Sequence, residues 1–408
     1  MHRYGILVTS FIFFSCENIG DGYQWQNNKS EGFSRHYGTI GYDHGWNAAY
    51  SPFDEGIIIV GRQQKNVNGQ TDLWAIKTDS RGIIEWQKVI GGGGNEEGYD
   101  VIATSDGGFL FVGYTWSFGN SQQIYVLKTD FHGNIEWEKA YGGSNWDVGN
   151  AVIEVAGGGF VIAGYSNSPG ISSGNTDVYI IKINSSGQQI WHKAYGSKVF
   201  PYHEWAFDIV ETEDHSLLIV GARDYYGNQK RNNLLIKVTS NGEFLWEKEL
   251  VEGDQVDASA YSISYAGSGN YFICSMENSL AKPDSYHPQI TKIDVEGNID
   301  WQRVFLANGQ KYHRFNSTPT RDGGLVIIGS SQRELSTGYD QDAFMVRIDY
   351  KGNIIWTNAY GTYDNDDWGW SVFETPKENL VFVGSTKSFG ASLFDIYLVG
   401  TNADGISQ

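Results

Sequence analysis

The chain has 408 residues, of which 48 are Asp or Glu and 29 are Lys or Arg, so its formal net charge at pH 7 is −19. This charge argues against binding to nucleic acid, which needs a basic surface, and against unaided binding to anionic lipid. The 51 Gly residues and the aromatic content of 15% are typical of many tight turns and packed sheets.

The first 16 residues have the pattern of an export signal. Arg3 supplies a positive charge, residues 6–14 are apolar but too few to span a bilayer, and Ser15 and Cys16 follow. This ending resembles the lipobox of bacterial lipoproteins, which would place a lipidated Cys16 at the outer membrane or cell surface. The alternative is an ordinary signal peptide with a chance Cys, which would give a periplasmic or secreted protein.

Residues 17–31 are polar and are expected to form a tether, so that any contact with a membrane runs through the lipid alone. The other cysteine of the chain, Cys274, lies in the apolar run "YFICS" and is expected to be a buried free thiol. Nothing in the sequence indicates self-association, and we expect a monomer.

From residue 32 onward the chain repeats one unit. The tryptophan of "IEW" and its counterparts recurs at steps of 51, 54, 55, 55 and 55 residues, beginning at Trp86, and an apolar run such as "FLFVG" (109–113) recurs seven times. Each unit holds four short runs rich in Val, Ile, Tyr, Phe and Trp between turn residues, which indicates four strands. The sequence therefore predicts an all-β protein, a seven-bladed β-propeller over 32–408.

The two ends of the repeat region predict how the ring closes. The last unit stops at "TNADGISQ", where its fourth strand should begin. An isolated strand, "GFSRHYG" at 32–38, precedes the first unit and carries Phe33 in the tryptophan position. We therefore expect 32–38 to complete the last blade, which removes an open sheet edge.

The repeat has the form D-x-y-x-x-K-x-D-x-x-G-N-x-x-W-x-K-x-Y-G-G, followed by D-G-G-x-x-x-x-G. It resembles the β-propeller repeats of secreted bacterial proteins and cell-surface lipoproteins, and its "G-N-I-x-W" segment is similar to the tryptophan motif of quinoprotein-type propellers. The resemblance covers about 32–408 and implies an exported protein, but no particular ligand, because propellers carry unrelated activities. The sequence offers no ligand set for a quinoprotein cofactor, and we expect no cofactor.

One recurring column, at the predicted start of the first strand of each unit, is rich in carboxylates. It holds Glu96, Asp147, Glu204 and Asp367 in four of the seven units. A ring of this kind would bind a cation such as calcium, since hard cations take several carboxylate oxygens. Recurrence favours the other interpretation, in which each carboxylate caps its own turn through backbone N–H groups.

Residues that break the repeat are better candidates for function. Many are aromatic and fall in the loops between the fourth and first strands or between the second and third, which meet on one face. We expect this face to bind a glycan or an envelope protein, because ring faces stack on sugar C–H groups while polar groups fix hydroxyls; the alternative is that the aromatic residues pack neighbouring loops. The predicted ligand-binding residues are His44, Trp46, Trp116, Trp146, Trp205, Tyr226, Tyr312, Trp368 and Trp370.

Catalysis on a polysaccharide is the second hypothesis, with Tyr202, His203, His313 and Arg314 as the candidates. A lyase needs a His or Tyr base beside a uronate carboxylate and a cation that neutralises it. No closely spaced His pair is present, so a zinc site is not indicated. The third hypothesis is a structural subunit of an envelope assembly, which exposed apolar side chains on the fourth strands would favour.

Overall fold

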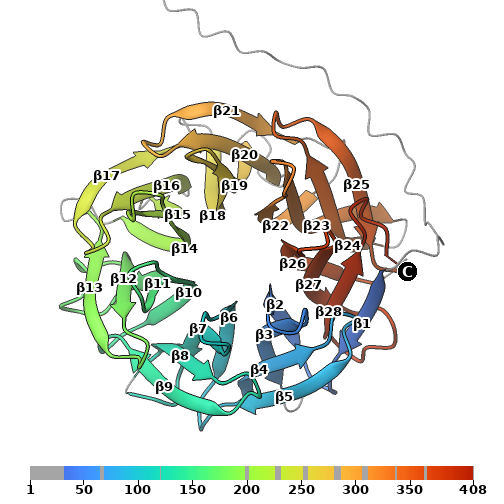
Figure 1. Ribbon diagram of the computed structural model, residues 1–408, viewed down its shortest axis with the longest axis horizontal. Coiled ribbons are helices and arrows are strands. Elements are labelled where there is room, and N and C mark those ends of the chain that lie inside the picture. The colour runs from blue at the N-terminus through green and yellow to red at the C-terminus, as the bar shows by residue number, and fades with distance from the viewer. Residues whose placement is uncertain are drawn as a thin grey trace, which may run out of the picture.

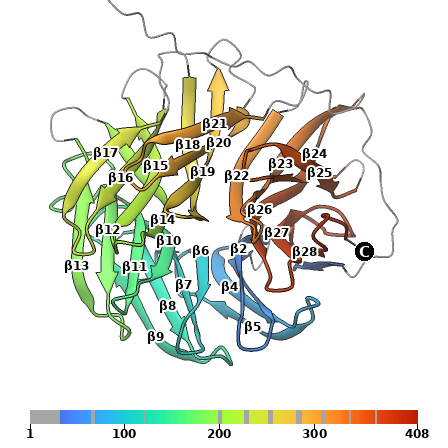
Figure 2. The same ribbon diagram turned by 45° about the horizontal axis from the view of Figure 1, so that its top comes forward.

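The computed structural model describes residues 32–64, 69–119, 121–197, 202–225, 231–250, 256–279, 286–305, 311–335, 338–362 and 365–407. Within them, 28 strands form seven antiparallel sheets of four strands around a central channel, which confirms the predicted seven-bladed β-propeller (Figure 1). In each blade, strand a lies next to the channel and strand d lies on the outside. The tilted view in Figure 2 shows the sheets standing around the channel.

The strands follow the chain order a, b, c and d through six blades. Blades 1 to 3 are β2 (His44–Tyr50), β3 (Ile57–Gln64), β4 (Thr71–Thr78) and β5 (Ile84–Ile90); β6 (Glu96–Ala103), β7 (Phe109–Thr115), β8 (Gln123–Thr129) and β9 (Ile135–Tyr141); and β10 (Asp147–Glu154), β11 (Phe160–Ser166), β12 (Asp177–Ile183) and β13 (Gln189–Tyr195). Blades 4 to 6 are β14 (His203–Glu211), β15 (Leu217–Asp224), β16 (Arg231–Val238) and β17 (Phe244–Glu249); β18 (Val256–Gly267), β19 (Asn270–Ser279), β20 (Tyr286–Asp294) and β21 (Ile299–Val304); and β22 (Lys311–Pro319), β23 (Leu325–Leu335), β24 (Gly338–Ile348) and β25 (Ile354–Tyr360).

Blade 7 is built from both ends of the repeat region, as the sequence predicted. It consists of β26 (Asp367–Glu374), β27 (Leu380–Thr386), β28 (Asp395–Thr401) and, as strand d, β1 (Phe33–Tyr37). β1 pairs antiparallel with β28 in a register that sets Phe33 opposite Gly400 and Tyr37 opposite Ile396. In Figure 1 the blue β1 accordingly lies beside the red β28.

The hydrophobic core lies between the blades rather than within them. Strands such as β4, β7 and β8 are buried nearly end to end, because each sheet is covered on both faces by its neighbours. The described residues form seven apolar clusters, each shared by two adjacent blades. The cluster that joins blade 7 to blade 1 packs Tyr37 and Leu398 against Ile59 and Trp74 and so closes the ring.

The tryptophan of strand d contacts the next blade, and this contact explains why a tryptophan and a glycine recur in the units. The indole N–H of Trp86 donates to the carbonyl of Phe131, in the c–d turn of the next blade, at 3.0 Å. Gly133 in that turn has φ +76°, and a Cβ there would lie 2.9 Å from the ring of Trp86, so only glycine fits. In the same way, Trp137 donates to Ser185 O in the c–d turn of blade 3, and Trp356 donates to Ala403 O in the c–d turn of blade 7.

Cys274 on β19 is fully buried as a free thiol, which confirms the prediction, and burial raises its pKa to about 12. Residues 1–31, with the predicted signal, Cys16 and the tether, lie outside the described residues. In the part of the chain that the structure covers, no helix is long and apolar enough to cross a membrane.

Candidate functional site

Each strand a starts on the face that carries the d–a and b–c loops, here called the loop face. The a–b and c–d turns form the opposite, turn face. Near its start, every strand a has a β-bulge that leaves one residue without a partner on strand b, and a bulge re-aims the side chain of that residue. The bulged residues of blades 1 to 7 are Trp46, Tyr99, Asn150, Phe207, Tyr261, Arg314 and Trp370.

The bulges of blades 7 and 1 gather five aromatic side chains, here called the aromatic platform: His44, Trp46, Trp368, Trp370 and Phe394. The ring of His44 stacks on Trp46, with centroids 5.3 Å apart, and on Trp368, 6.0 Å away and 7° from parallel. The rings of Trp46 and Trp370 are 5.1 Å apart, and Trp368 stacks on Phe394 at 4.3 Å. Four of the nine predicted ligand-binding residues are thus in mutual contact.

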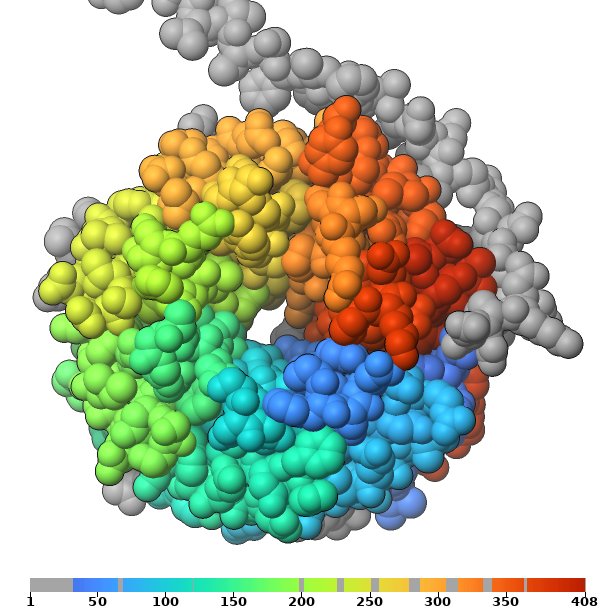
Figure 3. All heavy atoms as spheres, viewed as in Figure 1, coloured from blue at the N-terminus to red at the C-terminus, as the bar shows by residue number. Residues whose placement is uncertain are grey.

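The run of rings continues into blade 2. Tyr99 lies edge-on to Trp46 at 6.1 Å, and Tyr114 lies 5.7 Å from Tyr99. β26, β2 and β6 are neighbours at the edge of the channel (Figure 1 and Figure 3), and the rings of Trp46, Tyr99, Trp368 and Trp370 on these strands are half-buried. The rings form one contiguous cluster that spans three blades.

The polar atoms around the platform fix the rings in place. His44 Nδ1 and the Oγ of Ser385 are 2.9 Å apart, and the indole N–H of Trp370 donates to the same Oγ at 3.1 Å. Burial, assisted by the nearby positive charge of Arg62, lowers the pKa of His44 to about 3. The imidazole is therefore neutral at physiological pH, and it serves the platform as an aromatic ring rather than as a cation or a titrating base.

The recurring carboxylates have the geometry of turn caps. Glu96 accepts a hydrogen bond from the N–H of Gly92, and Asp147 accepts one from the N–H of Gly143, both at 2.8 Å. Asp367 accepts from Thr362 N at 3.0 Å, and burial raises its pKa to about 6. Within the described ranges, no group of three or more His, Cys, Asp or Glu side chains could hold a metal ion.

The fourth carboxylate of the column, Glu204, is fully buried and holds an arginine. Its Oε1 accepts from Nε of Arg223 at 3.1 Å, and the same guanidinium reaches Glu247 at 3.0 Å and Glu249 at 3.2 Å. Burial raises the pKa of Glu204 to about 7 in spite of Arg223. The charge of Arg223 is thus shared among three carboxylates.

Blade 4 carries a second aromatic group on the loop face, separate from the platform. His203 stacks on Trp205 with centroids 5.9 Å apart, and its Nδ1 lies 3.4 Å from the N–H of Thr176. Tyr202 packs edge-on against Tyr225 at 4.6 Å. These contacts place Tyr202 and His203 of the proposed catalytic set on one edge of blade 4. The side chains of the other two candidates, His313 and Arg314, lie outside the described residues.

Four further predicted ligand-binding residues lie away from the platform or outside the described residues. Trp116 and Trp146 are 44% and 57% exposed on the loops of blades 2 and 3, which leaves both rings accessible to a ligand. Tyr226 and the side chain of Tyr312 are outside the described residues.

Several basic side chains of the loop face are held by carboxylates, as Arg223 is. Arg62 lies 2.5 Å from Glu97, and Nε of Arg231 lies 3.2 Å from Asp257. Such pairing makes the platform and its surroundings poor in free positive charge. A ligand of the platform is therefore expected to be uncharged where it meets the rings.

Sequence reasoning missed Phe394, Tyr99 and Tyr114. Phe394 precedes β28, and its carbonyl accepts from Asp43 N at 2.8 Å, so its place depends on the closure of the ring. Tyr99 occupies the same bulge position as Trp46 and Trp370, which the sequence did select, so alignment of this column is the signal that could have found it.

Comparison with known proteins supports the fold. No protein-family model and no curated protein sequence matches the chain. Among solved structures, a PL25 ulvan lyase bound to a GlcA–Rha3S oligosaccharide superposes with a TM-score of 0.55 at 10% identity, over 90% of this chain and 96% of that one. The polysaccharide lyase Uly1 gives 0.52 at 9% identity, over 97% and 94%. At these identities the likeness concerns the propeller fold.

Proposed function

We propose that this chain is an exported, lipid-anchored β-propeller that binds a glycan on the aromatic platform without cleaving it. The observation that carries the proposal is the unbroken series of rings from Phe394 through the platform to Tyr114. Neighbouring centroids in this series lie between 4.3 and 6.1 Å apart. Ring faces and edges of this kind cover the apolar C–H faces of sugars, and the half-buried rings of the series, those of Trp46, Tyr99, Tyr114, Trp368 and Trp370, are partly accessible.

The charge distribution supports a neutral glycan. His44 at the centre of the platform is neutral at physiological pH, and the nearby guanidinium of Arg62 is paired with Glu97. An acidic polysaccharide would meet a chain of net charge −19 with no free cation on the platform to offset the repulsion.

The test is a titration of the purified protein with neutral and acidic polysaccharides, in which calorimetry and tryptophan fluorescence measure binding. We expect a neutral glycan to bind, and the double variant Trp46→Ala/Trp370→Ala to weaken binding at least about tenfold, because stacked aromatic anchors dominate such surfaces. The matched control is Phe53→Ala, which removes a ring that is 52% exposed on the turn face of the same blade. If no glycan binds, or if both variants bind as the unaltered protein does, the proposal is wrong.

A polysaccharide lyase is the second candidate, because the two lyase structures share the fold over nearly the whole chain. The described part of blade 4 supplies a base in Tyr202 or His203. Arg223, however, is held by three carboxylates, and neutralising a uronate would break those contacts. New ultraviolet absorbance from unsaturated uronates in the same titrations, abolished by His203→Ala, would favour this candidate over simple binding.

The outer strands support the third candidate, a subunit of an envelope assembly. Apolar side chains on strand d are exposed in six successive blades, among them Ile84, Ile135, Ile190, Phe244, Ile299 and Ile354. Sedimentation velocity separates this candidate from the first, because a protein that works alone stays monomeric over the concentration range in which it binds glycan.

The lipid anchor has its own test. Expressed in a bacterium with tritiated palmitate, the chain is expected to incorporate label, and Cys16→Ala is expected to abolish it. Export without label would leave an ordinary signal peptide as the explanation.

A further inference from the structure

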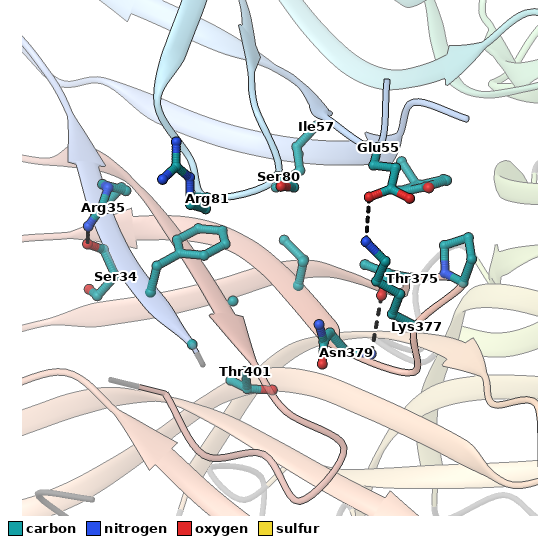
Figure 4. Close-up of a pocket in the computed structure, with 16 residues that line it drawn as sticks. Ser34, Arg35, Glu55, Ile57, Ser80, Arg81, Thr375, Lys377, Asn379 and Thr401 are labelled. Carbon is teal, nitrogen blue, oxygen red and sulfur yellow. Dashed lines mark hydrogen bonds and ion pairs between the residues drawn. The ribbon is translucent and has the colours of Figure 1, made fainter. Parts of the chain in front are cut away.

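A pocket lies on the turn face at the seam where blade 7 meets blade 1. Its volume is about 530 Å³, within the range of sites for small ligands, and it is lined by β1, by the end of β28, and by the turns of blades 1 and 7. Figure 4 shows Arg35 and Arg81 on one side of the pocket, and an ion pair between Lys377 and Glu55 on the other. Neither the proposed glycan site nor the predicted catalytic residues include this region.

The charge of the seam pocket sets it apart from the other grooves of the turn face. Its lining holds three cations and one carboxylate. The groove between blades 1 and 2 holds one lysine against three carboxylates, and the groove between blades 3 and 4 holds one lysine and one carboxylate, with His side chains in both. In a chain with a net charge of −19, the seam pocket is thus a local site of positive charge.

Arg35 supplies the charge that is available to a ligand. Arg81 is held by Asp79 at 3.0 Å, and Lys377 by Glu55 at 2.5 Å. Among the described residues, the one hydrogen bond of the Arg35 guanidinium runs from Nη1 to the carbonyl of its neighbour Ser34, at 2.9 Å. Its remaining N–H groups therefore have no carboxylate partner in the described chain.

Three of the six corresponding residues in the other blades are used differently. In blades 4, 5 and 6 the residue at this position of strand d bonds the c–d turn of the next blade: Lys248 donates to Glu296 O, Arg303 to Lys351 O, and Asn358 to Asp404 O. Arg35 does not make this bond to the turn of blade 1. The side chain at the position that bonds the neighbouring blade in blades 4, 5 and 6 instead lines the pocket at the seam.

The rest of the lining suits a hydroxylated ring. Ser34, Ser80, Thr375 and Asn379 offer hydroxyl and amide groups, and Phe33 and Tyr50 are among the apolar and aromatic side chains beside them. Hydroxyl and amide groups bond sugar hydroxyls, an aromatic ring covers a sugar face, and a guanidinium forms a charge-assisted bond with a carboxylate.

We propose that the seam pocket binds a small acidic sugar, either free or at the end of a chain, with its carboxylate on Arg35. Because the pocket contacts β1 together with blade 1, a bound sugar also ties the closing strand to the first blade. The proposal is independent of the glycan site, which lies on the opposite face of the propeller.

The experiment measures binding of D-glucuronate to the purified protein by saturation-transfer NMR and calorimetry, with D-glucose as the neutral counterpart. We expect glucuronate to bind and to raise the melting temperature with increasing concentration, and glucose to bind at least about tenfold more weakly, since it lacks the charge-assisted bond. Arg35→Gln should weaken glucuronate binding by a similar factor. An oligosaccharide ending in glucuronate is the second probe: if it binds and the monosaccharide does not, the pocket recognises a chain end.

The matched control is Lys193→Gln, which removes a positive charge from the same strand position in blade 3. It should leave glucuronate binding unchanged, and circular dichroism should show both variants folded. The proposal is overturned if neither probe binds, or if Arg35→Gln, folded as the control is, binds both probes as the unaltered protein does. It is equally overturned if Trp46→Ala/Trp370→Ala removes glucuronate binding, since the acidic sugar would then bind on the loop face.

Discussion

The guanidinium of Arg223 donates from Nε to the fully buried Oε1 of Glu204 at 3.1 Å, and the same group also neutralises Glu247 and Glu249. Removing it leaves three neighbouring carboxylates without their cation. We expect Arg223→Met to lower the free energy of unfolding by about 3–5 kcal/mol, the usual cost of breaking a buried ionic network. Urea denaturation of the variant measures this loss.

The control for this loss is an arginine on the surface. Arg81 is 77% exposed at its side chain and pairs with Asp79 alone, so Arg81→Met should cost at most about 1 kcal/mol. Equal losses in the two variants would mean that the network around Arg223 contributes no more than a surface pair. In that case the carboxylates around Arg223 would not prevent it from neutralising the carboxylate of a uronate.

His44 predicts a dependence of stability on pH. Burial, and then Arg62, lower its pKa in the folded chain to about 3, below the ordinary value of 6.5. The neutral ring therefore stabilises the fold fully above about pH 6.5, and this contribution is lost as the pH falls from there toward 3. His44→Gln cannot titrate, so its melting temperature should fall less than that of the unaltered protein between about pH 7.5 and 4.5. Equal falls in the melting temperatures of the two proteins would contradict a buried neutral imidazole.

Asp208 predicts a dependence of the opposite sign. It lies on strand a just after the bulge of blade 4, and burial, with a contribution from Asp100, raises its pKa to about 7. The ionised carboxylate costs stability, and this cost is absent below the ordinary pKa of 3.8 and grows as the pH rises to 7. Asp208→Asn, which matches Asn47 of blade 1, loses one acceptor for the N–H groups of Ile209 and Ile263, but it cannot ionise. Its stability relative to the unaltered protein should therefore be roughly 1–3 kcal/mol higher at about pH 8.5 than at about pH 4.

The control is Asp106, in the a–b turn of blade 2. Burial raises the pKa of its carboxyl group, but hydrogen bonds from Thr104 Oγ1 and Gly108 N outweigh burial and lower the pKa below its ordinary value. Its ionised form therefore stabilises the fold above about pH 4, and Asp106→Asn should lose stability there. A gain at pH 8.5 in both variants would point to a general effect of net charge rather than to burial of Asp208.

The sequence was sufficient for the fold because the signals that build a blade are local and repeated. A tryptophan such as Trp86 needs a glycine one unit later, and Gly133 supplies it in the turn that receives the indole. The closing strand was predictable for the same reason, since Phe33 keeps the step of the repeat.

The site was predictable only in part. The sequence placed His44, Trp46, Trp368 and Trp370 on one face, but their contact depends on two bulges in blades that are joined by the closing of the ring. A residue that recurs in the sequence also does not indicate where the β-bulge of its blade lies. The bulge of blade 6 comes at Arg314, one residue earlier in its unit than in the other blades, and the aromatic residue that follows it, Phe315, is buried.

The sequence also could not show which charged side chains form ion pairs with one another. Glu204 stands in a column that the sequence left open as a cation site, and Arg223 and Arg231 lie at the loop-face ends of β15 and β16. Their geometry makes them partners of carboxylates and of backbone groups, which depends on distances of a few ångströms between separate loops.

The last prediction concerns the closing strand itself. A chain that begins at residue 39 lacks β1, which exposes the hydrogen-bonding edge of β28 and removes Tyr37, whose hydroxyl donates to Gly82 O at 2.6 Å, from the core between blades 7 and 1. An unpaired inner strand of this kind invites pairing with another chain. We expect this chain to form oligomers or aggregates in size-exclusion chromatography, while a chain that begins at residue 32 stays monomeric, and we expect a synthetic peptide of residues 32–38 to restore the monomer. A monomer of unchanged melting temperature that needs no peptide would show that six complete blades and one of three strands hold the ring closed by themselves.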